Sequence, residues 1–192
     1  MISHKHKFIF IEVPKTGTRS ICSVLENNFS AVVLRPHLGA SKWHTHLERY
    51  QARFPKKIPS YFKFCFVRNP WDKIVSQYHF NRHSFGMNDY TFEEYVHAFK
   101  RGKRISWLNY DFLSWMTDDK GNMLMNFVGR FENLQEDFNI VCDKIGVPRQ
   151  KLPHRNKTKR THYTEYYDDE TREIVAEKYA KDIEYFGYKF GE

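Results

Sequence analysis

The feature that most constrains the fold is a short apolar run that passes through a tight polar turn into an amphipathic segment. Residues 8–13 (Phe-Ile-Phe-Ile-Glu-Val) are nearly all apolar, which is typical of a strand buried on both faces of a parallel sheet. Pro14 ends the run, and the apolar spacing that follows predicts a helix from Thr18 or Arg19. A strand, a turn and a helix in this order form the first unit of an α/β fold.

The same alternation of strands and helices continues along the chain, with an irregular stretch over 102–120. It predicts a single α/β domain, residues 1–192, in which a central parallel β-sheet is flanked by helices on both faces. Capping residues at Thr91 and Asp168 mark two of the helix starts. We expect further strands at 31–34, 61–67 and 123–131, and further helices at 47–54, from 71, from 91, over 134–145 and from 168 to about 185.

The composition of the chain indicates which class of partner it binds and in which cellular compartment it works. The chain has 31 Lys and Arg against 23 Asp and Glu, a formal charge of +8, which favours anionic partners without choosing among them. Its three cysteines lie far apart in apolar surroundings, which indicates buried reduced thiols. No segment resembles a signal peptide or a membrane span. We therefore expect a soluble, cytoplasmic protein, either a bacterial-type enzyme or an excised domain.

The turn after the first strand has the composition of a phosphate cradle. Ligands of open parallel sheets bind at the carboxyl ends of the strands, and unpaired N–H groups at a helix start attract anions. Gly17 lets the backbone approach a ligand closely, and Lys15 supplies a charge. The turn is not a Walker A loop, because Lys15 precedes its single glycine. The alternative is an ordinary polar turn. Its candidate hydroxyl donors are Thr16, Thr18 and Ser20.

A second anion site is predicted where the strand at 61–67 ends. Arg68 follows that strand directly, and Asn69-Pro70 breaks it before the next helix. Ser76 lies on that helix on the same face as Asp72. A guanidinium fork matches a terminal phosphate in a bidentate way. The alternative is that Arg68 pairs with Asp72 and that Ser76 merely faces solvent.

Together the two segments resemble the sulfotransferase superfamily, closest to its small members related to carbohydrate sulfotransferases. The resemblance extends to Gly129-Arg-Phe-Glu-Asn-Leu134 and to the ending over 163–188. It implies a P-loop NTPase-like sulfotransferase fold and a 3′-phosphoadenylyl sulfate (PAPS) donor. By the resemblance, Arg68 and Ser76 bind the 3′-phosphate of the donor, and Lys73 replaces the arginine usual after the aspartate. The implied ligands of the 5′-phosphosulfate are Lys15, Thr16, Gly17, Thr18, Arg19 and Ser20.

The resemblance also implies the reaction. A sulfuryl group passes from PAPS to an acceptor hydroxyl, expected on a carbohydrate, and 3′-phosphoadenosine 5′-phosphate (PAP) leaves. Lys15 would stabilise the leaving oxygens, so no metal is required. His44 or His46 would be the base, with His44 favoured by register, because a neutral imidazole accepts a proton near pH 7. His37 is a further candidate.

Two later segments carry weaker predictions. The basic loop 151–162 is expected to clamp the phosphates of the donor through Lys157 and Arg160; the alternative is a solvated run of charges. The aromatic segment 107–115 could line an acceptor site, or it could belong to the core.

Three rival functions remain at this point. A small-molecule P-loop kinase shares the cradle but needs Walker glycines and an acidic magnesium ligand. A basic nucleic-acid-binding protein fits the charge, yet no recognised binding motif is present. A nucleotide-binding protein without catalysis is the third. The partners expected from the preferred function are a sulfonucleotide and a hydroxyl acceptor, with no specific nucleic acid and no membrane span; the acceptor and the oligomeric state stay open.

Overall fold

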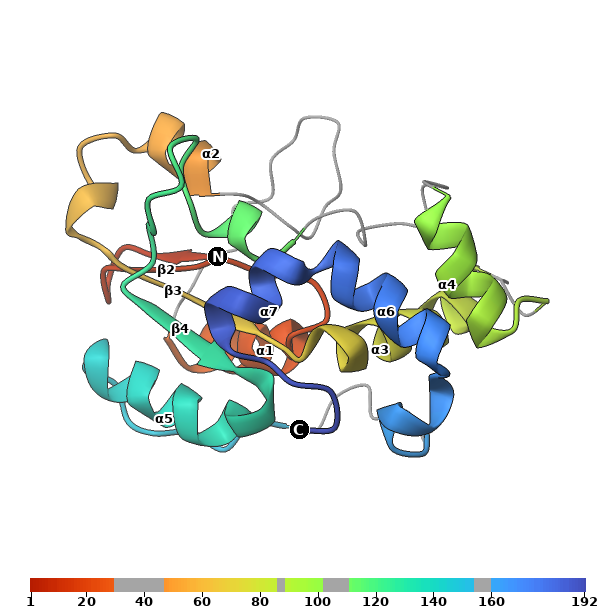
Figure 1. Ribbon diagram of the computed structural model, residues 1–192. Coiled ribbons are helices and arrows are strands. Elements are labelled where there is room, and N and C mark those ends of the chain that lie inside the picture. The colour runs from red at the N-terminus through yellow and green to blue at the C-terminus, as the bar shows by residue number, and fades with distance from the viewer. Residues whose placement is uncertain (30–46, 86–88, 102–110, 154–159) are drawn as a thin grey trace. The chain divides into compact units, whose positions relative to one another are not determined.

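The computed structural model describes residues 1–29, 47–85, 89–101, 111–153 and 160–192 (Figure 1). It divides into two compact units, which are described in turn. The first contains residues 1–67 and 114–155, and the second contains residues 68–113 and 156–192. That residues 1–192 act as one domain stays a prediction.

The first unit is built on a mostly parallel sheet, which confirms the predicted α/β class. Among the described residues the sheet has four strands in the order β1-β2-β3-β4, and only β1 runs antiparallel to its neighbour. Cross-strand pairs such as Phe10 with Phe64 set the register. The strands are β1 (Ile2–Ser3), β2 (Phe8–Phe10), β3 (Phe62–Val67) and β4 (Phe127–Arg130).

The predicted strands differ from the observed ones at their ends. The run over 8–13 pairs as a strand only to Phe10, although Ile11 still donates its N–H to the Phe64 carbonyl at 2.9 Å. The strand expected over 123–131 is limited to β4, and β1 was not predicted because it has only two residues. Residues 31–34 lie outside the described part of the chain.

Two helices, α1 (Thr18–Phe29) and α5 (Leu134–Lys144), pack on one face of the sheet. That face presents phenylalanines from β2 and β3, and the Phe10 and Phe64 rings stack with centroids 5.1 Å apart. Figure 1 shows α5 beside β4, in keeping with their many contacts. On the other face Ile9 and Cys65 are also fully buried, so both faces exclude water and the strands read as continuous apolar runs.

The rest of the first unit is short. Helix α2 (Leu47–Arg53) confirms the helical spacing at 47–54, and single turns η1 (Ile58–Ser60) and η4 (Phe131–Asn133) precede β3 and α5. The cysteines are free thiols, of which Cys65 is fully buried. Burial raises the pKa of Cys65 and Cys22 above the ordinary thiol value, so both stay protonated at neutral pH.

The second unit is helical with an aromatic core. Trp71, Tyr95 and Tyr179 are central members of that core. Both predicted caps are present: Thr91 forms a capping box with Glu94, and Asp168 accepts the Thr171 N–H. Its elements are α3 (Pro70–Phe85), α4 (Phe92–Lys100), η5 (Tyr163–Tyr166), α6 (Asp169–Lys178) and α7 (Ala180–Phe186), and η3 (Leu113–Trp115) begins at its boundary.

The prediction of one helix from 168 to about 185 was wrong, because the chain breaks at Tyr179. This residue has φ −108° and ψ 22°, and it is buried beside Phe99. In α7, which follows this residue, the Asp182 carboxylate accepts the N–H groups of Phe112 and Leu113 at 2.7 and 3.1 Å. These tertiary contacts outweigh the helical periodicity, which continues through the break.

A substitution at Gly129 tests how closely β4 packs against Phe66 of β3 and against α5. A Cβ at this position would lie 2.4 Å from Phe66 Cε1 and 3.1 Å from Asp137 Cβ, so Gly129→Ala must displace core atoms. We expect a loss of about 2–3 kcal/mol in the free energy of unfolding, measured by urea denaturation. Gly121→Ala adds the same methyl group into open space at φ +82°, and only backbone strain of about 1 kcal/mol should follow. Equal losses would contradict this packing.

Candidate functional site

The turn between β2 and α1 has an unusual backbone. Lys15 and Gly17 both have positive φ values, 68° and 79°, on either side of Thr16. A lysine in the left-handed region is uncommon, and such strain is characteristic of functional sites. The Thr16 hydroxyl donates to the Val13 carbonyl at 2.9 Å, and the Ser20 N–H donates to the Gly17 carbonyl at 3.0 Å. These bonds hold the turn in a defined shape.

Gly17 is required at its position for two reasons. Its φ disfavours any side chain, and a Cβ would lie 2.7 Å from Leu134 Cδ2 and 3.4 Å from Phe131 Cδ2. Phe131 and Leu134 belong to the segment 129–134, to which the resemblance described above extends. The structure thus gives that segment a physical role, since its apolar side chains press against the back of the turn.

The side chains of the turn are not equally available to a ligand. Thr16 is buried and uses its hydroxyl proton on Val13, so it supports the turn from within. Lys15 and Thr18 are half-buried, and Arg19 is exposed. In the first turn of α1, Ser20 and Ile21 donate their N–H groups to the Gly17 carbonyl. The N–H groups of Thr18 and Arg19 have no partner inside the helix, and the helix dipole adds positive potential there. This arrangement can bind an anion through backbone donors, with Lys15 beside them.

The second unit contains a compact cluster of charges at the start of α3. Arg68 donates from Nε and Nη2 to Asp72 Oδ2 at 2.8 and 2.7 Å. Arg160 donates from Nη2 to the other oxygen, Asp72 Oδ1. The pairing of Arg68 with Asp72, considered above as the alternative to anion binding, is therefore present, and Arg160 joins it from a part of the chain 88 residues away.

This cluster carries an excess of positive charge. Two guanidinium groups share one carboxylate, and Arg160 Nη1 is buried without a hydrogen-bond partner among the described residues. Ser76 lies one helical turn after Asp72 and is half-buried, so it belongs to the same side of α3. The surplus donor and the surplus charge fit an anionic ligand such as a phosphate.

The start of α3 is fixed by Asn69. Its Oδ1 accepts the Trp71 N–H at 3.1 Å, and its Nδ2 donates to the Lys189 carbonyl at 2.9 Å. Trp71 is in turn held by its indole N–H, which donates to the Arg172 carbonyl at 3.0 Å. These bonds anchor the backbone next to Arg68.

His79 lies two turns after Asp72 on α3 and was missed by the sequence analysis. Its Nε2 is 2.9 Å from the Tyr166 hydroxyl. Burial, followed by the charges of Arg160 and Arg82, lowers the pKa of His79 below its ordinary value. His79 is therefore neutral at pH 7 and adds no charge to the cluster.

Lys73 does not present its charge at the surface. It is 2% exposed, and its Nζ lies 4.2 Å from the ring centroid of Phe112 and 4.6 Å from that of Tyr179. Burial lowers its pKa to about 8, although the carboxylates of Asp182 and Asp111 act in the opposite direction. The charge of Lys73 thus lies inside an aromatic cage.

Several predicted site residues lie outside the described part of the chain. These are His44, His46 and Lys157, together with His37 and residues 107–110 of the aromatic segment 107–115. Their assignments stay predictions. The two aromatic side chains of that segment that are described, Phe112 and Trp115, are buried, as the core alternative expected.

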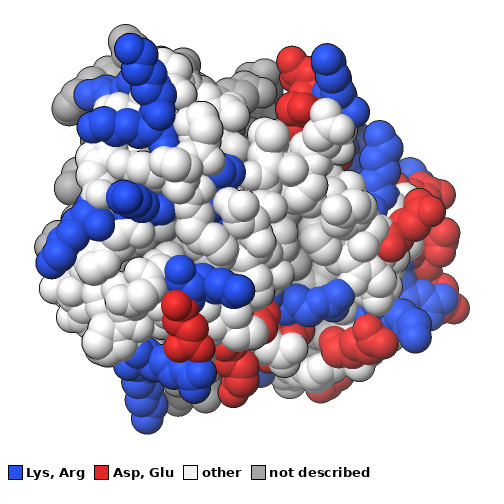
Figure 2. Space-filling model, turned by 90° about the vertical axis from the view of Figure 1, so that its left-hand side faces the viewer, with Lys and Arg blue, Asp and Glu red and all other residues white. Residues whose placement is uncertain are grey.

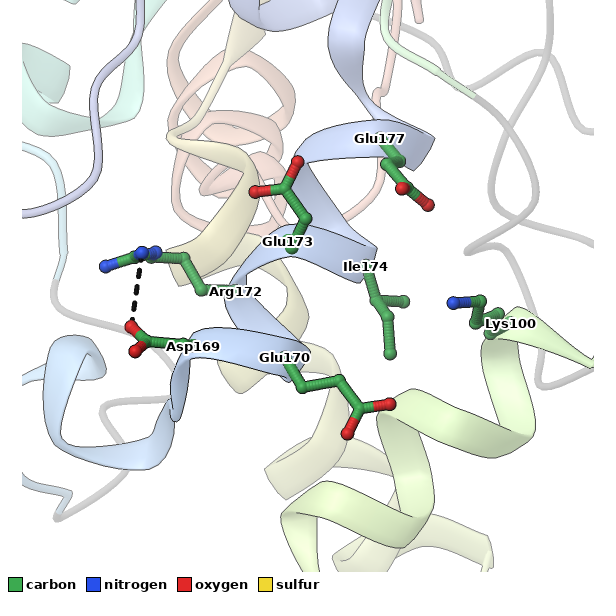
Figure 3. Close-up of a pocket in the computed structure, with 7 residues that line it drawn as sticks. All are labelled: Lys100, Asp169, Glu170, Arg172, Glu173, Ile174 and Glu177. Carbon is green, nitrogen blue, oxygen red and sulfur yellow. Dashed lines mark ion pairs between the residues drawn. The ribbon is translucent and has the colours of Figure 1, made fainter.

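A surface pocket of about 520 Å³ lies on the second unit along α6 (Figure 3). It contains four carboxylates and two basic groups, so its negative potential opposes a phosphorylated ligand. Figure 3 shows Asp169 and Arg172 paired, at 3.2 Å. We do not assign the anion site to it. The lining residues are Lys100, Asp169, Glu170, Arg172, Glu173, Ile174 and Glu177.

The net charge does not by itself mark the anion site. Figure 2 shows basic side chains spread over one face of the molecule, without acidic neighbours in its upper left part. Exposed basic residues of the first unit precede β2 and β3, and no Asp or Glu occurs over 1–11 or 50–67. The candidate turn follows the other end of β2. Those residues are Lys5, Lys7, Arg53, Lys56 and Lys57.

The described ranges lack the features of two other site classes. These ranges contain no group of three or more His, Cys, Asp or Glu side chains placed to hold a metal ion. No described helix combines the length and the apolar character that a membrane crossing requires.

Comparison with known proteins decides the family. A model described as "Sulfotransferase family" matches residues 1–189. The chain belongs to the sulfotransferase family. Membership makes it one of the PAPS-dependent transferases and implies a PAPS donor.

The relatives are distant. An uncharacterized protein of Archaeoglobus fulgidus is 35% identical over 50% of this chain and 76% of its own length. Human carbohydrate sulfotransferase 9 is 27% identical over 95% of this chain, and zebrafish (Danio rerio) carbohydrate sulfotransferase 14 is 23% identical over 98%. The chain spans only 47% and 61% of those two sulfotransferases. No solved structure matches it significantly.

The buried Lys73 predicts a specific pH dependence of stability. In the folded protein the Lys73 ammonium loses its proton near pH 8, whereas in the unfolded chain it keeps that proton up to about pH 10.5. The contribution of Lys73 to the free energy of unfolding therefore rises between these two pH values. The stability of wild type minus that of Lys73→Met should increase by about 1–3 kcal/mol from pH 7 to pH 10 in urea titrations.

Lys181→Met is the matched control, because Lys181 is an exposed lysine on α7. Its stability difference from wild type should stay flat with pH. A flat difference for Lys73→Met as well would contradict burial of a charged Lys73.

Proposed function

We propose that this sulfotransferase transfers a sulfuryl group from PAPS to a hydroxyl group, with a carbohydrate as the acceptor. The observation that carries the proposal is the turn after β2, where Lys15 and Gly17 take positive φ and Leu134 packs directly behind Gly17. Such a turn supplies backbone donors at a helix start, which is the arrangement that a phosphosulfate requires.

The turn would hold the 5′ end of the donor. In this proposal the N–H groups of residues 16–19 and the Thr18 hydroxyl donate to the 5′-phosphate. Ser20 and Arg19 flank that group, while Thr16 keeps the turn in shape through Val13. The Lys15 ammonium would lie at the oxygen that bridges phosphorus and sulfur.

The cluster at the start of α3 would hold the 3′ end. Arg68, Ser76 and Arg160 are the proposed ligands of the 3′-phosphate, with Lys157 as a further ligand from the basic loop. The surplus positive charge and the unpartnered Arg160 Nη1 support this assignment. A phosphate at this position distinguishes PAPS from ATP, so the cluster would set the donor specificity.

The proposed transfer step needs no metal ion. The acceptor oxygen forms a bond to sulfur as the bond between sulfur and the bridging oxygen breaks, and PAP leaves with the electron pair. A base removes the proton of the acceptor hydroxyl; we propose His44, with His46 as the other candidate. Negative charge grows on the leaving phosphate, and Lys15 with the turn amides would stabilise it.

The carbohydrate acceptor rests on the two carbohydrate sulfotransferases that the chain resembles at 27% and 23% identity. Trp107 and Tyr110 of the aromatic segment 107–115 are the proposed lining of the acceptor site, because Phe112 and Trp115 are buried. A panel of sugars, amines, lipids and phenols with labelled donor would identify the acceptor class.

Ligand-induced stabilisation separates this function from its rivals. PAP at a hundredfold excess over its dissociation constant should add about 2.7 kcal/mol to stability. For a chain of this length this corresponds to a shift of roughly 5–10 °C in the melting temperature. ATP with magnesium should shift it much less. Stabilisation by ATP alone would favour a kinase, and tight binding of random RNA or DNA without an effect of PAP would favour a nucleic-acid-binding protein.

Single substitutions test the assigned roles in transfer. Lys15→Ala should lower the transfer rate by about 10²–10³-fold, because it removes a cation at the leaving oxygen. Only one of His44→Ala and His46→Ala should lower it, by about 10²–10⁴-fold, which identifies the base. Lys120→Ala, at an exposed turn, serves as the control. Unchanged transfer by Lys15→Ala would remove Lys15 from the mechanism.

A further inference from the structure

We propose that Asp72 is a positioning residue that orients Arg68 and Arg160 and thereby makes the protein selective for nucleotides with a 3′-phosphate. This inference rests on the proposed function, because it concerns the residues assigned above to the 3′ end of the donor. Asp72 itself would not touch the ligand; it acts through the two guanidinium groups.

The hydrogen bonds fix both arginines. Arg68 uses two of its nitrogens on Oδ2 of Asp72, which sets the plane of its guanidinium as well as its position. Arg160 uses Nη2 on Oδ1, so the two oxygens of one carboxylate hold two cations from distant parts of the chain. The side chains of Arg68, Asp72 and Arg160 are 7%, 15% and 15% exposed, which limits their freedom to take other orientations.

The cluster is incomplete as a purely structural ion pair. One carboxylate balances only one of the two cations, and Arg160 Nη1 is buried with no partner among the described residues. Leaving a buried donor unsatisfied costs about 1–3 kcal/mol, more for a charged group. A phosphate close to Nη1 would satisfy this donor and neutralise the second charge, so the cost is recovered when the ligand binds.

A second Asp–Arg pair in the chain shows the contrast. Arg149 donates from Nε and Nη2 to the two oxygens of Asp143 at 3.0 and 2.7 Å. That pair joins one cation to one carboxylate, and its side chains are 64% and 50% exposed. It is neutral and solvated, so nothing in its geometry calls for another anion. Asp143 therefore provides a matched control for Asp72.

The substitution Asp72→Asn separates geometry from net charge. Asparagine keeps the size of the side chain but removes the charge-assisted bonds that hold both arginines. If simple attraction governed binding, loss of the carboxylate would strengthen the binding of every phosphate. If Asp72 acts by positioning, the variant should lose affinity for the 3′-phosphate despite its more positive charge.

The experiment compares PAP with adenosine 5′-monophosphate, which lacks only the 3′-phosphate, by isothermal titration of the whole chain. Wild type should prefer PAP. Asp72→Asn should bind PAP at least tenfold more weakly and the monophosphate within about twofold of wild type, which corresponds to a loss of at least about 1.4 kcal/mol confined to the 3′-phosphate. Asp143→Asn should retain the full preference.

The possible outcomes are distinguishable. A wild-type protein without preference for PAP would contradict the proposed function, whatever Asp72 does. A preference that persists or increases in Asp72→Asn would overturn the positioning role, as would an equal loss of affinity for both nucleotides. If Asp72→Asn fails to fold, Arg160→Gln provides the second variant: it removes Nη1 and keeps the pair of Asp72 with Arg68. It should also lose the preference for PAP, and its retention would overturn the proposal.

Discussion

The close contact between Gly17 and the start of α5 is the constraint on which the candidate site depends. The turn can take positive φ at Gly17 and still lie against α5 only because residue 17 has no side chain to collide with Leu134. That contact joins the first strand unit to a motif more than 100 residues later in the chain. The geometry of the turn is therefore a property of the packed unit rather than of the turn by itself.

At the start of α3, too, the candidate site depends on how side chains are arranged and not on overall composition. The overall charge of +8 is dispersed, and basic residues before β2 and β3 account for part of it. What distinguishes the cluster of Arg68, Asp72 and Arg160 is that two cations share one carboxylate in a poorly solvated place, and that Arg160 Nη1 lacks a hydrogen-bond partner among the described residues. The acidic pocket along α6 has the wrong sign of charge for a phosphate.

The local part of this arrangement could be predicted from sequence. The strand before Pro14, the helix from Thr18 and the caps at Thr91 and Asp168 follow from short-range patterns, and the structure has all of them. Contacts between distant segments could not be derived, because no periodicity encodes them. The pairing of Arg160 with Asp72, the support of Gly17 by Leu134 and the break at Tyr179 are of this kind. The roles of individual residues in transfer stay predictions for the same reason.

The central claim is that one sulfonucleotide is bound through both of its phosphates. A crystal structure of the protein with PAP tests this most directly. The account predicts the 5′-phosphate within hydrogen-bond distance of the N–H groups of residues 16–19, and the 3′-phosphate on Arg68, Ser76 and Arg160 Nη1. A PAP molecule bound elsewhere, or one whose 3′-phosphate contacts none of these side chains, would contradict it.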